Sequence, residues 1–345
     1  MAEPQKETML VAGPPFRGYV HMVADAFRSE GLDVSVLEWQ YLRRNLLQEV
    51  LYYSSGDYRA RLAEVQDRSN ALVLERALSA SPPTYVLVIK AVELTKRAME
   101  VCRARGTKLA LWAYDSASEY PIIQRCAHDY DLVYTYEPAD IDLLSGHCSP
   151  KLLPMAYDPR FYSKSAEKKD LDISFVGGID LYPERVRALR RIGKELRGAR
   201  IGVWTDSAHW YSHRRLLDAL RFTAVRSIEL HRQTLDHRTV SSIYNRSKIC
   251  LNMHHRQSVR ALNPRTFEIL GSGGLLLTDR RLDYIQGFED GDGYVHYSGE
   301  EDLIEKLRAL LRDENELRRI AEVGHARVQM HTYRERARTI LADLM

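Results

Sequence analysis

The residues best suited to chemistry lie in one stretch, from Asn263 to Asp279, which reads NPRTFEILGSGGLLLTD. Asn263 can cap a helix that has Pro264 in its first turn, and free backbone amides there, beside Arg265, would bind a diphosphate. Glu268 follows Arg265 by three residues, so one helix face can present a cation and a carboxylate. A carboxylate there can accept hydrogen bonds from the vicinal hydroxyls of a ribose. The alternative is an ordinary helix–loop–strand unit with a surface ion pair.

Two residues of the first half are candidate acid–base groups. Asp115 follows the apolar run LALW at residues 109–112, and polar groups at the ends of parallel strands face bound ligands. It could accept a proton from a hydroxyl as a general base. Equally, Asp115 or Ser116 could cap the following helix. His21 is the second candidate, although a lone histidine within a helix is more often a packing or surface residue.

His254 ends a predicted strand, where its ring could contact a phosphate or a sugar hydroxyl. The sequence offers little for a metal. His209 and His213 are four residues apart but lack a third ligand, and the four cysteines form no C-x-x-C pair. We therefore expect no metal site.

Short apolar runs alternate with amphipathic stretches along the whole chain, which predicts right-handed βαβ units and parallel sheets. The predicted strands are 9–12, 34–37, 85–89, 109–112, 132–134, 173–176, 199–204, 225–230, 248–252 and 274–278. The predicted helices are 20–27, 41–78 (divided near residues 54–56), 91–104, 120–128, 184–196, 239–244 and 266–271, and the chain is helical from 300 onwards with breaks near 313 and 331.

The periodicity lapses after residue 154, so we expect two domains. The fold class is α/β, with two tandem Rossmann-like doubly wound domains facing a central cleft. The predicted domains are 1–155 and 156–330, and a C-terminal helix at 331–345 is expected to pack on the first domain.

Charge and hydropathy exclude several kinds of protein. The 345 residues include 50 Lys and Arg against 47 Asp and Glu, a net charge of +3. This is too balanced for binding nucleic acid chiefly by charge. No apolar run approaches the ~18 residues of a membrane helix. We expect a cytoplasmic protein with no integral membrane association and no nucleic-acid partner.

The segment 263–279 resembles the signature of the CgeB-like (spore-maturation-type) glycosyltransferases, in which an Arg-x-Phe-Glu helix leads through small residues into an apolar strand ending in Thr-Asp. Three other segments fit that family in the same order: 152–158, 172–178 (DISFVGG, with Arg185 after it) and 247–254 (SKICLNMH). The resemblance implies the GT-B fold, with the nucleotide-sugar donor on the C-terminal domain and the acceptor on the N-terminal one.

Carried over residue by residue, Glu268 matches the glutamate that holds the ribose hydroxyls in related retaining enzymes. Their E-x7-E motif is broken here, because Arg260 stands where the first carboxylate is expected. The catalytic histidine of many inverting relatives is also missing, since Phe16 and Arg17 occupy its loop. Arg265 and Arg185 are the candidates for binding the phosphates, and Arg260 is a third candidate. The residues expected at the donor site are Gly177, Gly178, Arg185, His254, Asn263, Arg265, Thr266 and Glu268.

We expect a metal-independent transferase without a cofactor, because helix amides and arginines would stabilise the departing diphosphate. It would move a sugar from a nucleoside-diphosphate sugar, with UDP favoured, to a hydroxyl on a small molecule, glycan or protein in glycoconjugate, polysaccharide or natural-product biosynthesis. The nucleotide-sugar 2-epimerases share this architecture, but their residues are not found here. The broken motif keeps open an alternative, a degenerate transferase that acts as a nucleotide-sugar-binding or scaffold protein.

Overall fold

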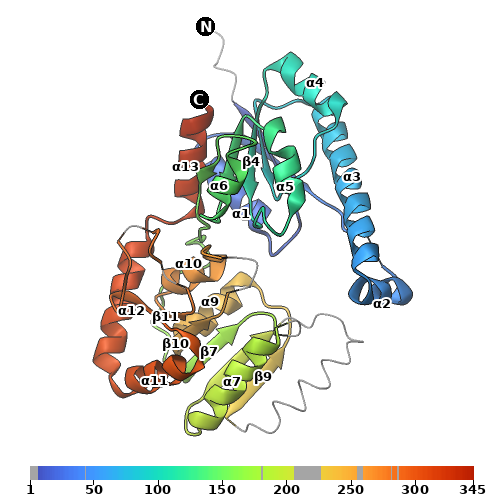
Figure 1. Ribbon diagram of the computed structural model, residues 1–345. Coiled ribbons are helices and arrows are strands. Elements are labelled where there is room, and N and C mark those ends of the chain that lie inside the picture. The colour runs from blue at the N-terminus through green and yellow to red at the C-terminus, as the bar shows by residue number, and fades with distance from the viewer. Residues whose placement is uncertain are drawn as a thin grey trace. The chain divides into compact units, whose positions relative to one another are not determined.

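The computed structural model describes residues 7–42, 44–179, 182–205, 227–254, 259–280, 282–285 and 287–345. His209 and His213 lie outside the described residues. The chain forms two compact units (Figure 1). Unit 1 comprises Met1–Pro154, Gln257–Ala261 and Tyr333–Met345, and unit 2 comprises Met155–Arg256 and Leu262–Thr332.

Unit 1 is built on a six-stranded parallel sheet of order β2-β1-β3-β4-β5-β6. Its strands are β1 (Thr8–Gly13), β2 (Asp33–Glu38), β3 (Tyr85–Ile89), β4 (Lys108–Ala113), β5 (Leu132–Thr135) and the short β6 (Lys151–Leu152). The first five strands occur where the apolar runs predicted them. β3 is buried at every position, as expected for a parallel strand covered on both faces.

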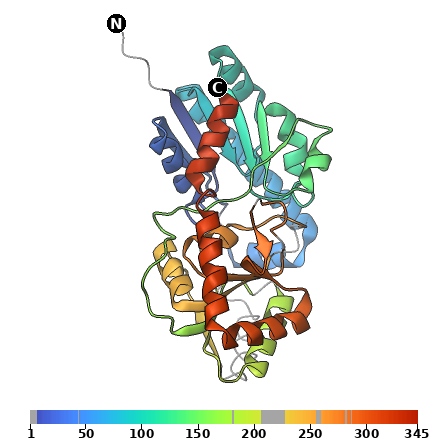
Figure 2. The ribbon, with the colours of Figure 1, turned by 90° about the vertical axis from the view of Figure 1, so that its left-hand side faces the viewer.

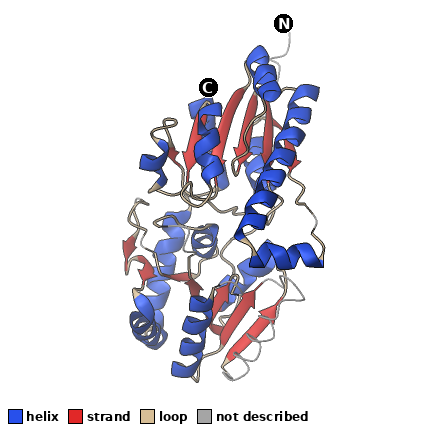
Figure 3. Ribbon diagram, turned by 45° about the vertical axis from the view of Figure 1, so that its right-hand side comes forward, coloured by secondary structure: helices blue, strands red, loops and turns tan. Residues whose placement is uncertain are grey.

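Helices cover both faces of this sheet (Figure 3). They are α1 (Tyr19–Ser29), α2 (Leu46–Ser54), α3 (Gly56–Ala80), α4 (Lys96–Arg105), α5 (Pro121–Cys126), the 3-10 helix Ala127–Asp129, α6 (Asp140–Leu144) and α13 (Tyr333–Leu344). The predicted division near residues 54–56 is confirmed. Only the second half of α3 is buried, and α2 lies at the other end of this long helix (Figure 1). The C-terminal α13 packs against α1, beside the blue strands of the N-terminus (Figure 2).

Unit 2 contains a seven-stranded parallel sheet of order β12-β13-β11-β10-β7-β8-β9. The strands are β7 (Leu171–Val176), β8 (Ile201–Thr205), β9 (Ile228–Arg232), β10 (Ser247–Asn252), β11 (Leu275–Thr278), β12 (Glu289–Asp290) and β13 (Gly293–His296). The helices are α7 (Pro183–Glu195), α9 (His237–Arg246), α10 (Pro264–Gly271), α11 (Gly299–Arg312) and α12 (Glu314–Val328). The predicted break near residue 313 separates α11 from α12, and residues 225 and 226 of one predicted strand lie outside the described residues.

Each sheet has one place where the strand order reverses direction. In unit 1 the chain builds β2 on one side of β1 and then continues with β3 on the other. In unit 2 it builds β8 and β9 on one side of β7 and then continues with β10 on the other. Open α/β sheets bind ligands beyond the carboxyl ends of their strands at such a switch point. Ligand-binding residues are therefore expected after β1 and β3 in unit 1, and after β7 and β10 in unit 2.

Across the described ranges, every helix is too short or too polar to span a lipid bilayer.

Candidate functional site

Arg185 bridges the switch point of unit 2. It lies in the first turn of α7 and is 5% exposed. Its Nη1 donates to the carbonyl of Gly178, and its Nη2 donates to that of Met253, both at 2.7 Å. These carbonyls follow β7 and β10, so the side chain ties the two strand ends together. Burial, and then the charge of Arg265, lowers the pKa of Arg185 to about 10, and the side chain remains charged at neutral pH.

Arg265 places a second cation at the same point. It is the second residue of α10, and its Cζ lies 3.7 Å from where a Cβ on Gly177 would be. The absence of a side chain at Gly177 thus leaves room for the guanidinium beside the end of β7. Within the described ranges, no carboxylate is hydrogen-bonded to Arg185 or to Arg265. The charges of Asp279 and Glu184 offset the repulsion at Arg185 only in part, because the pKa of Arg185 is still lowered. Two guanidiniums that repel each other and lack a hydrogen-bonded carboxylate form a site for an anion.

The N-terminus of α10 is fixed by a network of polar side chains. Asn263 caps the helix, as predicted, by accepting from the amide of Thr266 at 3.2 Å. Asn252, at the end of β10, donates to the Oδ1 of Asn263 at 3.0 Å and the Oγ1 of Thr266 at 3.1 Å. Since the cap uses the Thr266 amide and Pro264 has none, this terminus offers fewer free amides than the sequence suggested. Thr266 is fully buried and positions the helix.

His254 is a buried positioning residue. Its side chain is 1% exposed, its Nδ1 lies 2.7 Å from Asp279, and its Nε2 lies 3.5 Å from Thr266. Burial lowers the pKa of His254 despite the opposing charge of Asp279, so the ring is neutral at pH 7. The ring positions Asp279 and Thr266, and its expected direct contact with a phosphate or a sugar stays a prediction. Within the described ranges, His254 and Asp279 have no third His, Cys, Asp or Glu with which to hold a metal ion.

Asp279 is a site residue that the sequence reasoning missed. It follows β11 and accepts from both the amide and the ring of His254. Burial opposes its charge, but the hydrogen bonds from His254 prevail and lower the pKa of Asp279. The available signal was its place at the end of the apolar strand LLLT. Glu268, in the second turn of α10, is 3% exposed and belongs to the same helix face as Arg265.

The two glycines after β7 contribute differently. A Cβ on Gly177 would lie 3.1 Å from the ring of Phe175, tighter than ordinary packing. A Cβ on Gly178 would meet only Tyr182, at 3.6 Å, which is a normal van der Waals contact. Gly177 therefore supplies space beside Arg265, whereas Gly178 supplies the carbonyl that Arg185 holds.

The acid–base candidates of unit 1 lie in different surroundings. Asp115 follows β4 and pairs with Lys90 at 2.9 Å, and both line a cavity of about 510 Å3. The capping alternative is not observed, because α5 begins after Tyr120, and Ser116 instead donates to Asp140. His21 lies on α1 with 56% of its side chain exposed, 3.3 Å from Glu38. It does not line this cavity.

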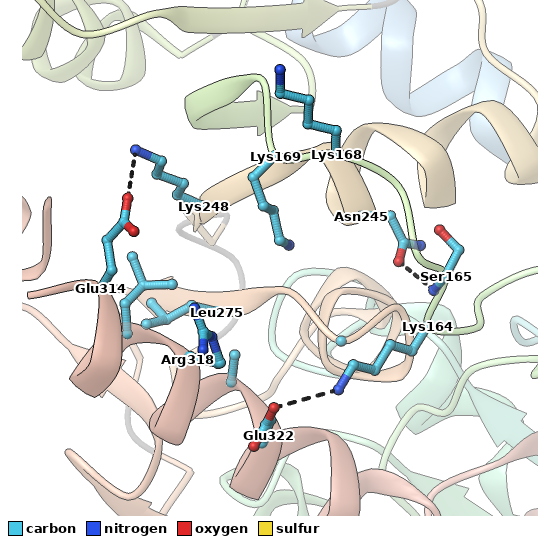
Figure 4. A pocket seen from close by; sticks show the side chains of 13 residues that line it. Lys164, Ser165, Lys168, Lys169, Asn245, Lys248, Leu275, Glu314, Arg318 and Glu322 are labelled. Carbon is cyan, nitrogen blue, oxygen red and sulfur yellow. Dashed lines mark hydrogen bonds and ion pairs between the residues drawn. The ribbon is translucent and has the colours of Figure 1, made fainter.

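A hollow of about 540 Å3 lies at the opposite edge of the unit 2 sheet, near the starts of β10 and β11 (Figure 4). Two of the five cations that the described residues place around it are paired with acids. Lys248 lies 3.2 Å from Glu314, and Lys164 lies 3.8 Å from Glu322. This hollow is on the amino edge of the sheet and does not belong to the site at the switch point.

Comparison with known proteins gives matches to glycosyltransferases. No curated protein sequence matches the chain. The fold resembles that of sucrose-phosphate synthase from Thermosynechococcus elongatus (TM-score 0.72, 11% identity, covering 98% of each chain). It also resembles a glycosyltransferase from Rickettsia africae (TM-score 0.69, 10% identity, covering 99% of this chain and 98% of the other). A third match is an alpha,alpha-trehalose-phosphate synthase (UDP-forming) from Burkholderia xenovorans (TM-score 0.68, 12% identity, covering 98% of this chain and 100% of the other).

Such low identities show the fold, and the family evidence comes from the sequence of the second half. The model of a family described as glycosyl transferase-like matches residues 185–342. This range contains Arg185, the α10 network and Asp279. Together these matches support glycosyltransferase activity. Residues 185–342 thus match the model of the glycosyl transferase-like family, in a chain that has the GT-B fold.

Proposed function

We propose that unit 2 binds a nucleoside-diphosphate sugar, with UDP as the favoured nucleotide, and that the enzyme transfers the sugar to a hydroxyl without a metal ion. The observation that carries the proposal is the pair of guanidiniums at the switch point. Arg185 and Arg265 stand at the ends of β7 and β10 with no hydrogen-bonded carboxylate among the described residues. A diphosphate would relieve their mutual repulsion.

The same arrangement suits the chemistry of sugar transfer. Negative charge develops on the diphosphate as the bond to the sugar breaks, and preorganised cations stabilise that charge most where water is excluded. In the proposed site, Arg265 contacts the diphosphate directly. Arg185 stabilises the same negative charge at longer range and holds the two strand ends together. Glu268, three residues along α10, would accept hydrogen bonds from the ribose. The two arginines would thereby stabilise the negative charge that a metal ion stabilises in other transferases.

The preference for UDP is supported by one of the fold relatives, whose description includes "UDP-forming". The acceptor is a hydroxyl on a small molecule, a glycan or a protein in a biosynthetic pathway. Asp115 is the proposed group that receives or orients this hydroxyl, and it is paired with Lys90 at 2.9 Å.

The test is calorimetric titration and thermal stabilisation with UDP, GDP, dTDP and CDP. A nucleotide at a hundredfold excess over its dissociation constant should stabilise the protein by about 2.7 kcal/mol. At the same nucleotide concentration, Arg265→Ala should reduce this stabilisation to about 0.4–1.4 kcal/mol. The matched control is Arg187→Ala, on the same helix as Arg185, because Arg187 pairs with Glu300 at the surface.

One nucleotide that binds wild type and the Arg187 variant equally, but binds the Arg265 variant at least about tenfold more weakly, supports the proposed site. Absence of binding by all four nucleotides refutes the donor site and favours the scaffold alternative. Nucleotide binding without turnover of any UDP-sugar, including hydrolysis, would likewise favour a binding protein.

A further inference from the structure

The hollow at the amino edge of the unit 2 sheet has no part in the proposed sugar transfer (Figure 4). Its volume of about 540 Å3 falls within the range of small-ligand sites. The residues that line it come mainly from the segment 164–169, from the starts of β10 and β11, and from the first half of α12. All of them belong to unit 2.

One wall of the hollow is fixed by contacts with the rest of the unit. Asn245, at the end of α9, is 4% exposed; it accepts from the amide of Ser165 at 2.7 Å and donates to the carbonyl of Ser163 at 2.9 Å. The aliphatic stem of Lys164 lies against Gly273, where a Cβ would come within 2.8 Å of its Cγ. The cations of this segment are therefore held at the hollow.

Lys169 points into the hollow from this wall (Figure 4). Its Nζ donates to the carbonyl of Ser247 at 2.8 Å, which is a neutral acceptor. Burial lowers the pKa of Lys169, the charge of Lys164 lowers it further, and the charge of Glu167 opposes this more weakly. Cys250 would oppose it only as a thiolate, and burial raises the pKa of that thiol to about 11. An ammonium that is partly removed from water gains more from a nearby anion than a solvated one does.

Two other cations of the hollow have acidic partners of unequal strength. Lys248 is paired with both Asp172, at 3.1 Å, and Glu314, at 3.2 Å. Lys164 lies 3.8 Å from Glu322, and both of these side chains are about half exposed. A pair this long and exposed contributes little, so Lys164 can turn from Glu322 to a ligand.

The remaining cations have no carboxylate partner in the part of the chain that the structure describes. Lys168, Lys169 and Arg318 all line the hollow, and none of them forms an ion pair with a described residue. The other residues of unit 2 contain more arginines than acids, so their sequence adds no excess of negative charge. Unpaired cations on opposite elements, the segment before β7 and α12, favour an anionic ligand.

The lining also contains apolar side chains, those of Leu275, Leu317 and Ala321. Inorganic phosphate would leave this surface unused, whereas a phosphate ester can cover it with its carbon skeleton. Lysine ammoniums bind phosphate as point charges, and an arginine adds two parallel donors.

We infer that this hollow is a second ligand site, which binds a small organic phosphate with its phosphate group on Lys169 and Arg318 and its carbon skeleton on the apolar lining. The inference does not rest on the proposed function, because the hollow lies at the opposite edge of the sheet from Arg185 and Arg265.

The test is isothermal titration of the full-length protein with ribose 5-phosphate, phenyl phosphate, inorganic phosphate and uncharged ribose. At least one of the two esters should bind about fivefold or more tightly than inorganic phosphate and than ribose. The relative affinities of the two esters distinguish a sugar phosphate from an aryl phosphate.

Variants then locate the binding. Arg318→Gln and Lys169→Met should each weaken the ester by about fivefold or more. Arg318 is exposed and has no ion pair among the described residues, so its replacement changes the charge without disturbing the fold. The matched control is Lys194→Gln, an exposed lysine of α7 that does not line the hollow, which should stay within about twofold of wild type. Ester binding should also survive Arg265→Ala, which excludes the donor site.

Several results would overturn the inference. Absence of binding by both esters refutes the site, and equal binding of inorganic phosphate refutes the organic ligand. An equal loss in the Arg318 and Lys194 variants would show that only the overall charge matters. A loss in the Arg265 variant would place the ester in the donor site. Failure of UDP to bind would refute the proposed function and leave this site standing.

Discussion

Arg185 and Arg265 share one site, yet their removal should change stability differently. Arg185→Met removes two charge-assisted hydrogen bonds of 2.7 Å and leaves the carbonyls of Gly178 and Met253 without them. Each such bond is worth about 1.5–3 kcal/mol, so the unfolding free energy of unit 2 should fall by about 3–6 kcal/mol. Arg265→Ala removes a cation that repels Arg185. Its effect should be between zero and about 1 kcal/mol of added stability.

Both variants should nevertheless weaken the binding of UDP. Loss of the direct contact in Arg265→Ala should cost about 1.5–3 kcal/mol of binding, which is roughly a tenfold to hundredfold weaker affinity. The assay is differential scanning calorimetry of the whole chain, paired with titration of UDP. Because a two-unit protein need not unfold in one step, the transition that UDP shifts in wild type identifies unit 2. Arg187→Ala should alter neither quantity by more than about 0.5 kcal/mol.

Two outcomes would contradict this reasoning. If Arg265→Ala destabilises the protein as much as Arg185→Met does, Arg265 is a structural residue and the pair is not an anion site. If Arg185→Met leaves the calorimetric transition unchanged, the two carbonyl contacts do not hold the ends of β7 and β10 together.

Three further predictions concern single positions. Glu137 is fully buried and accepts from three backbone amides, including that of Ala261 at 3.0 Å; Glu137→Gln should lower the unfolding free energy of unit 1 by about 2–3 kcal/mol in denaturant titrations. In calorimetric titration, Gly177→Ala should weaken the binding of UDP, whereas Gly178→Ala should not. Equal effects of the two substitutions would show that UDP binding does not depend on the space beside Arg265. His254 has a pKa below its unfolded value near 6.5, so the stability it contributes is complete above that pH and is lost as the pH falls further. The melting temperature of wild type should consequently drop more between pH 7.5 and 5 than that of His254→Gln, and parallel profiles would show that the ring is not held neutral by the fold.

The strands were the most predictable part of the fold. Apolar runs such as YVLVI at residues 85–89 can only be buried on both faces, and they form β3 and its neighbours. The cap at Asn263 was equally readable, since an asparagine followed by proline marks a helix start. The short strands β6, β12 and β13 were not predicted, because two to four residues carry too little pattern and depend on the neighbouring strand.

Contacts between distant segments could not be read from the sequence. Arg185 was assigned to the phosphates by resemblance, but nothing in its neighbourhood indicated that it would bind carbonyls after both β7 and β10. The cavity of unit 1 is a stronger example. Its cations Arg44 and Arg59 lie on segments that looked merely charged and periodic, and only the packing of this part of the chain places them in the same cavity as Asp115.

Glu137 binds the backbone at the position where the E-x7-E motif is broken. Arg260 occupies the position of the absent carboxylate, and its amide donates to Glu137, as does that of Ala261. The chain passes from unit 1 to unit 2 directly afterwards, at Leu262, and then enters α10. Glu137 therefore fixes the segment that leads into the helix of Arg265. Its carboxylate is 0% exposed and is fully occupied by amides, so it does not replace the missing group at a donor sugar.

Pairing, rather than the number of charges, determines where this chain can bind an anion. The most conspicuous basic cluster in the sequence is on α7, yet its Arg187 and Arg191 are paired with Glu300 and Glu301 at 2.6 and 2.7 Å. Arg185 belongs to the same helix but faces the sheet, and its fellow cation Arg265 lies 80 residues further along the chain. A net charge of +3 averages over both situations and so excludes only binding by bulk charge. A local surplus of positive charge arises where the fold places one cation beside another and no carboxylate is hydrogen-bonded to either, and among the described residues that condition holds for Arg185 and Arg265 at the strand ends where the site is proposed.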